Sequence, residues 1–97
     1  MRVIAKRSLR VFWQQHPGAR GPLEAWHQEA SKARWQNPQQ IKERYASASF
    51  VGRERVVFNI GGNKYRLVVR INYTVGIIFI RFIGTHAEYD RINVEQV

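Results

Sequence analysis

Apolar side chains recur every three or four residues through the first part of the chain, the spacing that places them on one helix face. The pattern predicts one helix that ends at Pro17-Gly18, a second that opens at Gly21-Pro22, and a short third helix capped by Asn37. An apolar run at residues 2–5 precedes them and is suited to an edge strand. The expected buried faces are Leu9, Phe12, Trp13 and His16, then Leu23, Trp26, Ala30 and Ala33, then Ile41 and Tyr45.

Trp35 fits the helical spacing less well than the other two tryptophans. It closes the second helix, just before Asn37 and the proline that follows. Trp13 and Trp26 occupy helical core positions, so we expect them inside the protein. Trp35 is the tryptophan that we expect to be available to a partner.

After Tyr45 the hydrophobic period changes from 3.6 to 2, which predicts β-strands. Alternation indicates strands at residues 56–60 and 65–73, joined by a hairpin turn at residues 61–64. The two glycines of this turn are expected to adopt positive φ. One face of the second strand carries Leu67, Val69, Ile71 and Tyr73, and the other carries Arg66, Val68, Arg70 and Asn72.

The following run, residues 76–83, is apolar on both faces except at Arg81. We therefore expect it to be the central and most buried strand. Gly84 ends this strand, and Thr85 and Glu88 have the spacing of a capping box that opens a final short helix. Helices followed by a β-meander and a short helix predict a single α+β domain over residues 1–97.

The charge balance indicates a polyanionic partner. Sixteen Lys and Arg against seven Asp and Glu give a net charge of +9. The basic residues concentrate in residues 1–20 and 53–81, whereas residues 82–97 carry more acids than bases. The absence of cysteine excludes disulfides and thiolate zinc sites. No segment approaches the roughly 18 apolar residues of a membrane span, so we expect a folded cytoplasmic protein without membrane association.

The familiar motifs of metal and nucleotide chemistry are missing. The histidines at positions 16, 27 and 86 have no metal-binding spacing with one another. No glycine-rich loop precedes a helix, because the paired glycines lie inside the hairpin. We therefore expect neither a metal site nor a cofactor.

The last helix carries the most informative residues. His86, Tyr89 and Asp90 fall at positions i, i+3 and i+4, so an imidazole, a phenol and a carboxylate share one face. They follow the strand that carries Arg81, and the neighbouring strand carries Arg66. Phosphodiester cleavage without a metal needs a base, an acid and cations at the phosphate. Arginine suits the cation role because its planar fork grips phosphate with two hydrogen bonds.

The same residues also have a purely structural interpretation. Half-buried His and Tyr near the end of a chain are ordinarily packing residues with a satisfied polar tip. Thr85 and Glu88 are explained by helix capping, and a solvated strand face explains Arg66 and Arg70. Spacing alone leaves both interpretations open.

Two longer motifs add a family resemblance. They are Val57-Phe-Asn-Ile-Gly-Gly-Asn-Lys-Tyr-Arg-Leu-Val-Val and Thr85-His-Ala-Glu-Tyr-Asp. With Tyr73, Ile80-Arg81 and the order of the N-terminal helices, they closely resemble the HigB toxin family. This family is a branch of the RelE-like mRNA interferases of bacterial type II toxin–antitoxin modules. The resemblance spans nearly the whole chain.

The resemblance implies a RelE-like α+β fold, with N-terminal helices packed on a small, twisted, mainly antiparallel sheet and a short C-terminal helix. It implies a metal-independent endoribonuclease toxin that cleaves mRNA on the translating ribosome. It also implies a helix-turn-helix antitoxin of the HigA type as partner, with operator DNA bound only through the toxin–antitoxin complex.

Carried over to this sequence, the resemblance implies that Arg66 and Arg81 are ligands of the phosphate or the transition state. His86 and Tyr89 are the acid–base candidates, and Asp90 supports them. Many RelE-like toxins instead cluster more lysines near the catalytic arginine, so which residue is the base stays open. The weaker candidates for RNA contacts are Lys64, Arg70, Asn59 and Asn63, of which turn structure also explains the two asparagines.

Two other functions compete with this one. A non-catalytic basic module would bind RNA or the ribosome without cleavage, in a strongly salt-dependent manner. A RelE/ParE-fold toxin acting on a protein target would damage DNA rather than mRNA. The pairing of acid–base residues with arginines favours the nuclease, and a helix-turn-helix protein encoded by the neighbouring gene would support the toxin.

Overall fold

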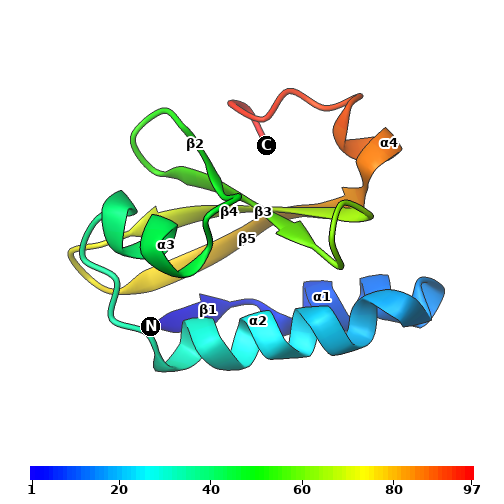
Figure 1. Ribbon diagram of the computed structural model, residues 1–97, viewed down its shortest axis with the longest axis horizontal. Coiled ribbons are helices and arrows are strands. Elements are labelled where there is room, and N and C mark those ends of the chain that lie inside the picture. Colours follow the sequence, from blue (N-terminus) through cyan, green and yellow to red (C-terminus); the bar gives the residue numbers. More distant parts are fainter.

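The computed structural model describes residues 1–97 and has a helical layer packed on one face of a single sheet. Helices α1 (Lys6–Gln15) and α2 (Arg20–Lys32) run side by side on one side of the sheet (Figure 1). The short helix α4 (His86–Tyr89) and the C-terminal segment lie on the other side (Figure 1). The expected α+β class, with helices on a small sheet and a short C-terminal helix, is therefore confirmed.

The helices begin and end close to the predicted signals. A 3₁₀ turn, η1 (Pro17–Ala19), separates α1 from α2. The side chain of Asn37 accepts a hydrogen bond from the backbone N–H of Gln40 at 3.0 Å, so it caps helix α3 (Pro38–Arg44) as predicted. Proline at the first helical position supports the same start, because its missing N–H would have no partner there.

The sheet has five strands in the order β1-β5-β4-β3-β2. The pairing of β1 with β5 is parallel, and the other pairings are antiparallel. The edge strand predicted at the start of the chain is therefore present. The bounds are β1 (Arg2–Ile4), β2 (Ser49–Val51), β3 (Arg55–Ile60), β4 (Tyr65–Asn72) and β5 (Ile77–Thr85).

The hairpin between β3 and β4 has the predicted turn. Gly61 and Gly62 adopt φ of 63° and 71°, in the left-handed region that favours glycine. The register then places Asn59 opposite Arg66 and Ile60 opposite Tyr65. The turn thus fixes which basic side chains of β4 share a face of the sheet.

The hydrophobic core lies between the helices and one face of the sheet. Trp26 of α2 contacts Phe58 of β3 with ring centroids 5.4 Å apart. The sheet residues in this core alternate along β3 and β4, as the hydrophobic period of two predicted. They are Val56, Phe58 and Ile60 from β3, Leu67, Val69 and Ile71 from β4, and Ile78 from β5.

We call the face of the sheet turned away from α1 and α2 the open face. It carries Val57 and Val68, which are 3% and 0% exposed but do not belong to the helix-side core. The C-terminal segment runs on this side of the sheet (Figure 1). Arg55 fixes its end, because Nε and Nη2 donate to the carbonyl oxygen of Val97 at 3.2 and 2.9 Å. Burial of the two valines indicates that the segment covers this part of the open face.

Strand β5 departs from the prediction in two ways. It is second in the sheet rather than central, and the central strand is β4. Only Ile78 and Gly84 of β5 are buried, because β1 pairs with no residue of β5 beyond Phe79. The strand also continues past Gly84 to Thr85. The prediction that residues 76–83 form the most buried strand was therefore wrong.

Two further predictions need correction. Trp35 lies beyond the end of α2 and is 8% exposed, stacked on Phe58 with ring centroids 6.3 Å apart. It is thus a core residue and not a surface for a partner. Strand β2 was not predicted, because three residues are too few to show alternation.

Candidate active site

The short helix α4 is built by a capping box directly after β5. The backbone N–H of Glu88 donates to Thr85 Oγ1 at 3.2 Å, and the N–H of Thr85 donates to Glu88 Oε1 at 2.8 Å. These hydrogen bonds from Thr85, with a smaller contribution from nearby His16 and Arg91, lower the pKa of Glu88. The box thus fixes where the four residues of α4 point.

The predicted pair on α4 is formed. His86 Nδ1 lies 3.1 Å from Asp90 Oδ2, and the two side chains are 53% and 59% exposed. A carboxylate beside one ring nitrogen favours the proton on that nitrogen and leaves the other free to accept one. The imidazole is therefore accessible to solvent, with the Asp90 carboxylate beside it.

Strand β4 begins beside this helix and supplies cations. The backbone N–H of His86 donates to the carbonyl oxygen of Lys64 at 3.1 Å, which joins α4 to the start of β4. Arg66 lies opposite Gly84 of β5, and Gly84 precedes His86 by two residues. Its Nη1 donates to the carbonyl oxygens of Asn63 and Tyr65, both at 3.2 Å. The structure thus brings Lys64, Arg66, His86 and Asp90 to one end of the sheet.

The other acid–base candidate lies on α4 itself, and the second arginine lies on β5, five residues before His86. Tyr89 is half-buried on α4, one turn after His86. Arg81 is exposed on β5, at a point where the strand has one residue more than its partner. The register pairs Ile80 with Val69 and Phe82 with Val68, so Arg81 is the extra residue of a β-bulge.

The weaker candidates divide into two groups. Asn59 lies opposite Arg66 on the open face, and the backbone carbonyl oxygen of Asn63 accepts a hydrogen bond from the Arg66 guanidinium. Both asparagines therefore adjoin Arg66. Arg70 is four residues further along β4, about 13 Å away at the usual rise per residue. Its Nε lies 2.6 Å from Glu54 Oε2, and its guanidinium lies 6.0 Å from the centre of the Phe79 ring. The structure does not bring Arg70 together with His86.

Some neighbours of the site were not predicted. Tyr65, opposite Thr85, packs against Phe12 and His16 with ring centroids 5.5 and 6.0 Å apart. Glu54 was not recognised as the partner of Arg70, because the β2–β3 turn that positions it follows an unpredicted strand. No signal in a single sequence pairs such distant residues.

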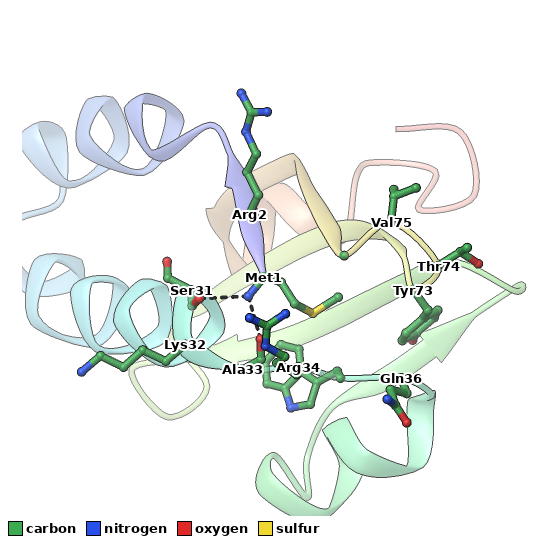
Figure 2. Close-up of a pocket in the computed structure, with 12 residues that line it drawn as sticks. Met1, Arg2, Ser31, Lys32, Ala33, Arg34, Gln36, Tyr73, Thr74 and Val75 are labelled. Carbon is green, nitrogen blue, oxygen red and sulfur yellow. Dashed lines mark hydrogen bonds between the residues drawn. The ribbon is translucent and has the colours of Figure 1, made fainter.

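A polar cavity lies at the opposite end of the sheet. It has a volume of about 630 Å³ and lies among the end of α2, the start of β1 and the β4–β5 turn (Figure 2). The amino group of Met1 donates there to the carbonyl oxygens of Ala30, Ser31 and Ala33. Burial and the nearby Arg34 lower the pKa of this amino group. None of the candidate site residues lines this cavity.

No group of three or more His, Asp and Glu side chains is arranged to hold a metal ion. None of the helices is both long and apolar enough to cross a membrane.

Comparisons with known proteins define the class. The family model of the HigB toxin, the RelE-like toxic component of a toxin–antitoxin system, matches residues 19–92. The match includes every candidate site residue. The α+β architecture, with a mixed five-stranded sheet and a short C-terminal helix, is consistent with this RelE-like class.

Curated relatives extend over nearly the whole chain. The mRNA interferase toxin HigB of Escherichia coli (strain K12) is 28% identical over 92 residues, 93% of this chain and 88% of that protein. The mRNA interferase HigB of Shigella flexneri gives the same values. That of Escherichia coli O6:H1 is 23% identical over 94 residues, 95% of this chain and 91% of that protein. The chain belongs to the HigB family of toxins, and an antitoxin is therefore its partner.

Proposed function

We propose that the protein is an mRNA interferase that cuts the RNA backbone without a metal ion, at the end of the sheet formed by α4 and the start of β4. The observation that carries the proposal is the exposed His86–Asp90 pair beside Lys64 and Arg66 in a chain of the HigB family. The relatives named above are themselves mRNA interferases.

The reaction assigns a role to each group. His86 takes the proton of the 2′-hydroxyl, whose oxygen attacks the adjacent phosphorus, and Asp90 orients the imidazole. Tyr89 supplies a proton to the departing 5′-oxygen. Arg66 and Arg81 stabilise the charge that develops on the phosphorane oxygens, because charged donors make strong hydrogen bonds to phosphate oxygens. The products are a 2′,3′-cyclic phosphate and a 5′-hydroxyl.

The remaining basic and amide groups serve binding. Lys64 contributes positive charge beside the reacting phosphate, and Asn59 and Asn63 contact RNA from the β3–β4 hairpin. Arg70 contributes more weakly, because Glu54 already neutralises it. We propose that residues 1–97 act as one toxin domain in the cytoplasm on mRNA bound to translating ribosomes. A helix-turn-helix antitoxin of the HigA type neutralises the toxin, and the toxin reaches operator DNA only through that complex.

Induction of the wild-type gene in a bacterial host tests the proposal. We expect growth arrest and new mRNA 5′ ends, and we expect His86→Gln to lower cleavage by roughly 10²- to 10⁴-fold, the usual contribution of general base catalysis. The double variant Arg81→Ala, His86→Gln should abolish both effects. Because His86 is exposed, its substitution should leave the melting temperature nearly unchanged.

His27→Gln is the matched control. His27 lies on α2 in the helical layer, and burial followed by the charge of Lys6 lowers its pKa. It has no place in the proposed reaction, so its substitution should leave cleavage at the wild-type rate. Equal cleavage by the folded His86→Gln and His27→Gln variants would contradict the assignment. Arrest without new RNA ends would favour a toxin that acts by binding or on a protein.

A further inference from the structure

Strand β5 places two phenylalanines on the open face of the sheet. Phe79 lies opposite Arg70, and Phe82 lies opposite Val68, both partners being open-face residues of β4. Simple alternation would put residues three apart on opposite faces. The bulge at Arg81 adds one residue between them and so brings both rings to the same side.

Neither ring is part of the hydrophobic core. Phe79 and Phe82 are half-buried, and they are neither among the core residues nor among the apolar side chains packed against them. Their neighbours Ile78, Ile80 and Ile83 all belong to one of those two groups. Packing between the helices and the sheet therefore does not explain why the open face carries two aromatic rings.

The ring of Phe82 reaches toward the candidate active site. A Cβ built on Gly84 would lie 2.5 Å from Cζ of Phe82 and 3.1 Å from Oε1 of Glu88. The tip of the ring therefore rests on Gly84, between β5 and α4. Since Gly84 lies opposite Arg66, the ring is next to the arginine that we assign to the phosphate.

The ring of Phe79 lies further from α4 on the same strand. The guanidinium of Arg70 lies 6.0 Å from its centre. The bulge residue Arg81 is exposed between the two phenylalanines. The open face thus has two aromatic rings beside Arg66 and Arg70 of β4, with Arg81 exposed at the bulge between them in β5.

We propose that Phe82 and Phe79 form a stacking platform for two bases of the RNA, with the base next to the cut phosphate on Phe82. Aromatic rings among arginines are the usual surface for single-stranded nucleic acid, because rings stack on bases while cations neutralise phosphates. The net charge of +9 matches a polyanion. This inference rests on the proposed nuclease function and makes Phe82 a residue that positions the base next to the cut, with at most a modest preference between bases.

Substitution of each ring tests the platform in the mRNA 5′-end assay. We expect Phe82→Leu to lower cleavage on the order of tenfold, the usual loss when the aromatic side chain under a stacked base is removed. Phe79→Leu should lower cleavage less. The base preference next to the cut should weaken in Phe82→Leu. Phe82→Tyr and Phe82→Trp keep a stacking ring and should retain cleavage.

Phe50→Leu is the matched control, because Phe50 is a half-buried phenylalanine of β2, the edge strand on the other side of the sheet from β5. It should keep the wild-type rate and base preference. Absence of cleavage by the wild type would refute the nuclease itself. If the wild type and Phe82→Leu cleave with the same rate and the same base preference, only the platform is refuted. The platform would also be refuted if Phe82→Leu cut normally but escaped neutralisation by the antitoxin, since the patch would then be a protein contact.

A measurement on the wild-type protein covers the case in which Phe82→Leu does not fold. A ribosome-bound message carrying an abasic nucleotide next to the cut should be cleaved on the order of tenfold more slowly than the intact message. An abasic nucleotide placed six positions away should have no effect. Equal rates for all three messages would overturn the proposal.

Discussion

Substitution of Gly84 by alanine is a sharp test of the geometry at the end of β5. The added Cβ would lie 2.5 Å from Cζ and 3.0 Å from Cε2 of Phe82. Real Cβ atoms essentially never approach other heavy atoms as closely as 2.5 Å, so the phenylalanine ring must rotate away. It must also leave the position beside α4 that the proposed platform needs.

The size of the effect follows from what has to move. The obstruction is the tip of a side chain rather than backbone, so we expect a cost of about 1–2 kcal/mol, the lower part of the range for overpacking. For a domain of this size each kcal/mol lowers the melting temperature by about 4–8 °C. Cleavage should fall although the protein still folds, because the displaced ring no longer lies beside α4.

A double-mutant cycle isolates the contact. In a Phe82→Ala background the two ring contacts are gone and only Glu88 Oε1, at 3.1 Å, stays close to the added Cβ, so adding Gly84→Ala should cost much less than in the wild type. We therefore expect a coupling of about 1–2 kcal/mol between the two positions, measured by urea unfolding of the four proteins. Additive effects would refute the position assigned to the Phe82 ring.

Three other changes have expected outcomes. Thr85→Ala removes the cap of α4 and should lower the free energy of unfolding in urea by about 0.5–2 kcal/mol. Cleavage should also fall, because the His86 ring is no longer held in place, and unchanged cleavage would contradict this. The pKa of Glu88 in the folded protein is lowered from 4.5, so the ionised carboxylate stabilises the fold fully above pH 4.5 and loses this effect as the pH falls through the lowered pKa. Glu88→Gln should therefore lose less stability than the wild type in thermal melts between about pH 5 and 2. The hydroxyl of Tyr73 is buried without a hydrogen-bond partner, and burial raises its pKa. Tyr73→Phe should therefore keep the free energy of unfolding or raise it by up to about 1–2 kcal/mol, and it should remove the fall in stability that the wild type shows as the pH rises above about 10. A destabilised Tyr73→Phe would show that the hydroxyl has a partner.

Local signals in the sequence predicted most of the secondary structure. The cap at Asn37, the hairpin glycines and the capping box of Thr85 and Glu88 each depend on contacts within a few residues. Short-range contacts of this kind are visible in a single sequence. The same holds for the pairing of His86 with Asp90, because the two are one helical turn apart.

Features set by distant contacts were not visible. The apolar run of β5 indicated a central strand, but its position is decided by the short β1, which covers only part of it. Simple alternation would place Phe82 on the same face as Ile80, whereas the bulge puts the two on opposite faces. Trp35 lacks helical spacing because a loop, not a helix, brings it onto Phe58.

The chemistry of the new RNA ends tests the central claim most directly. Attack by the 2′-hydroxyl with His86 as the base leaves a 5′-hydroxyl on the downstream fragment, and hydrolysis by metal-bound water would leave a 5′-phosphate. In cells that express the wild type, we predict ends that ligate to an adapter only after phosphorylation by a kinase, and we predict their loss in the folded His86→Gln variant but not in His27→Gln. Ends that ligate without kinase treatment, or equal cleavage by His86→Gln, would contradict the account.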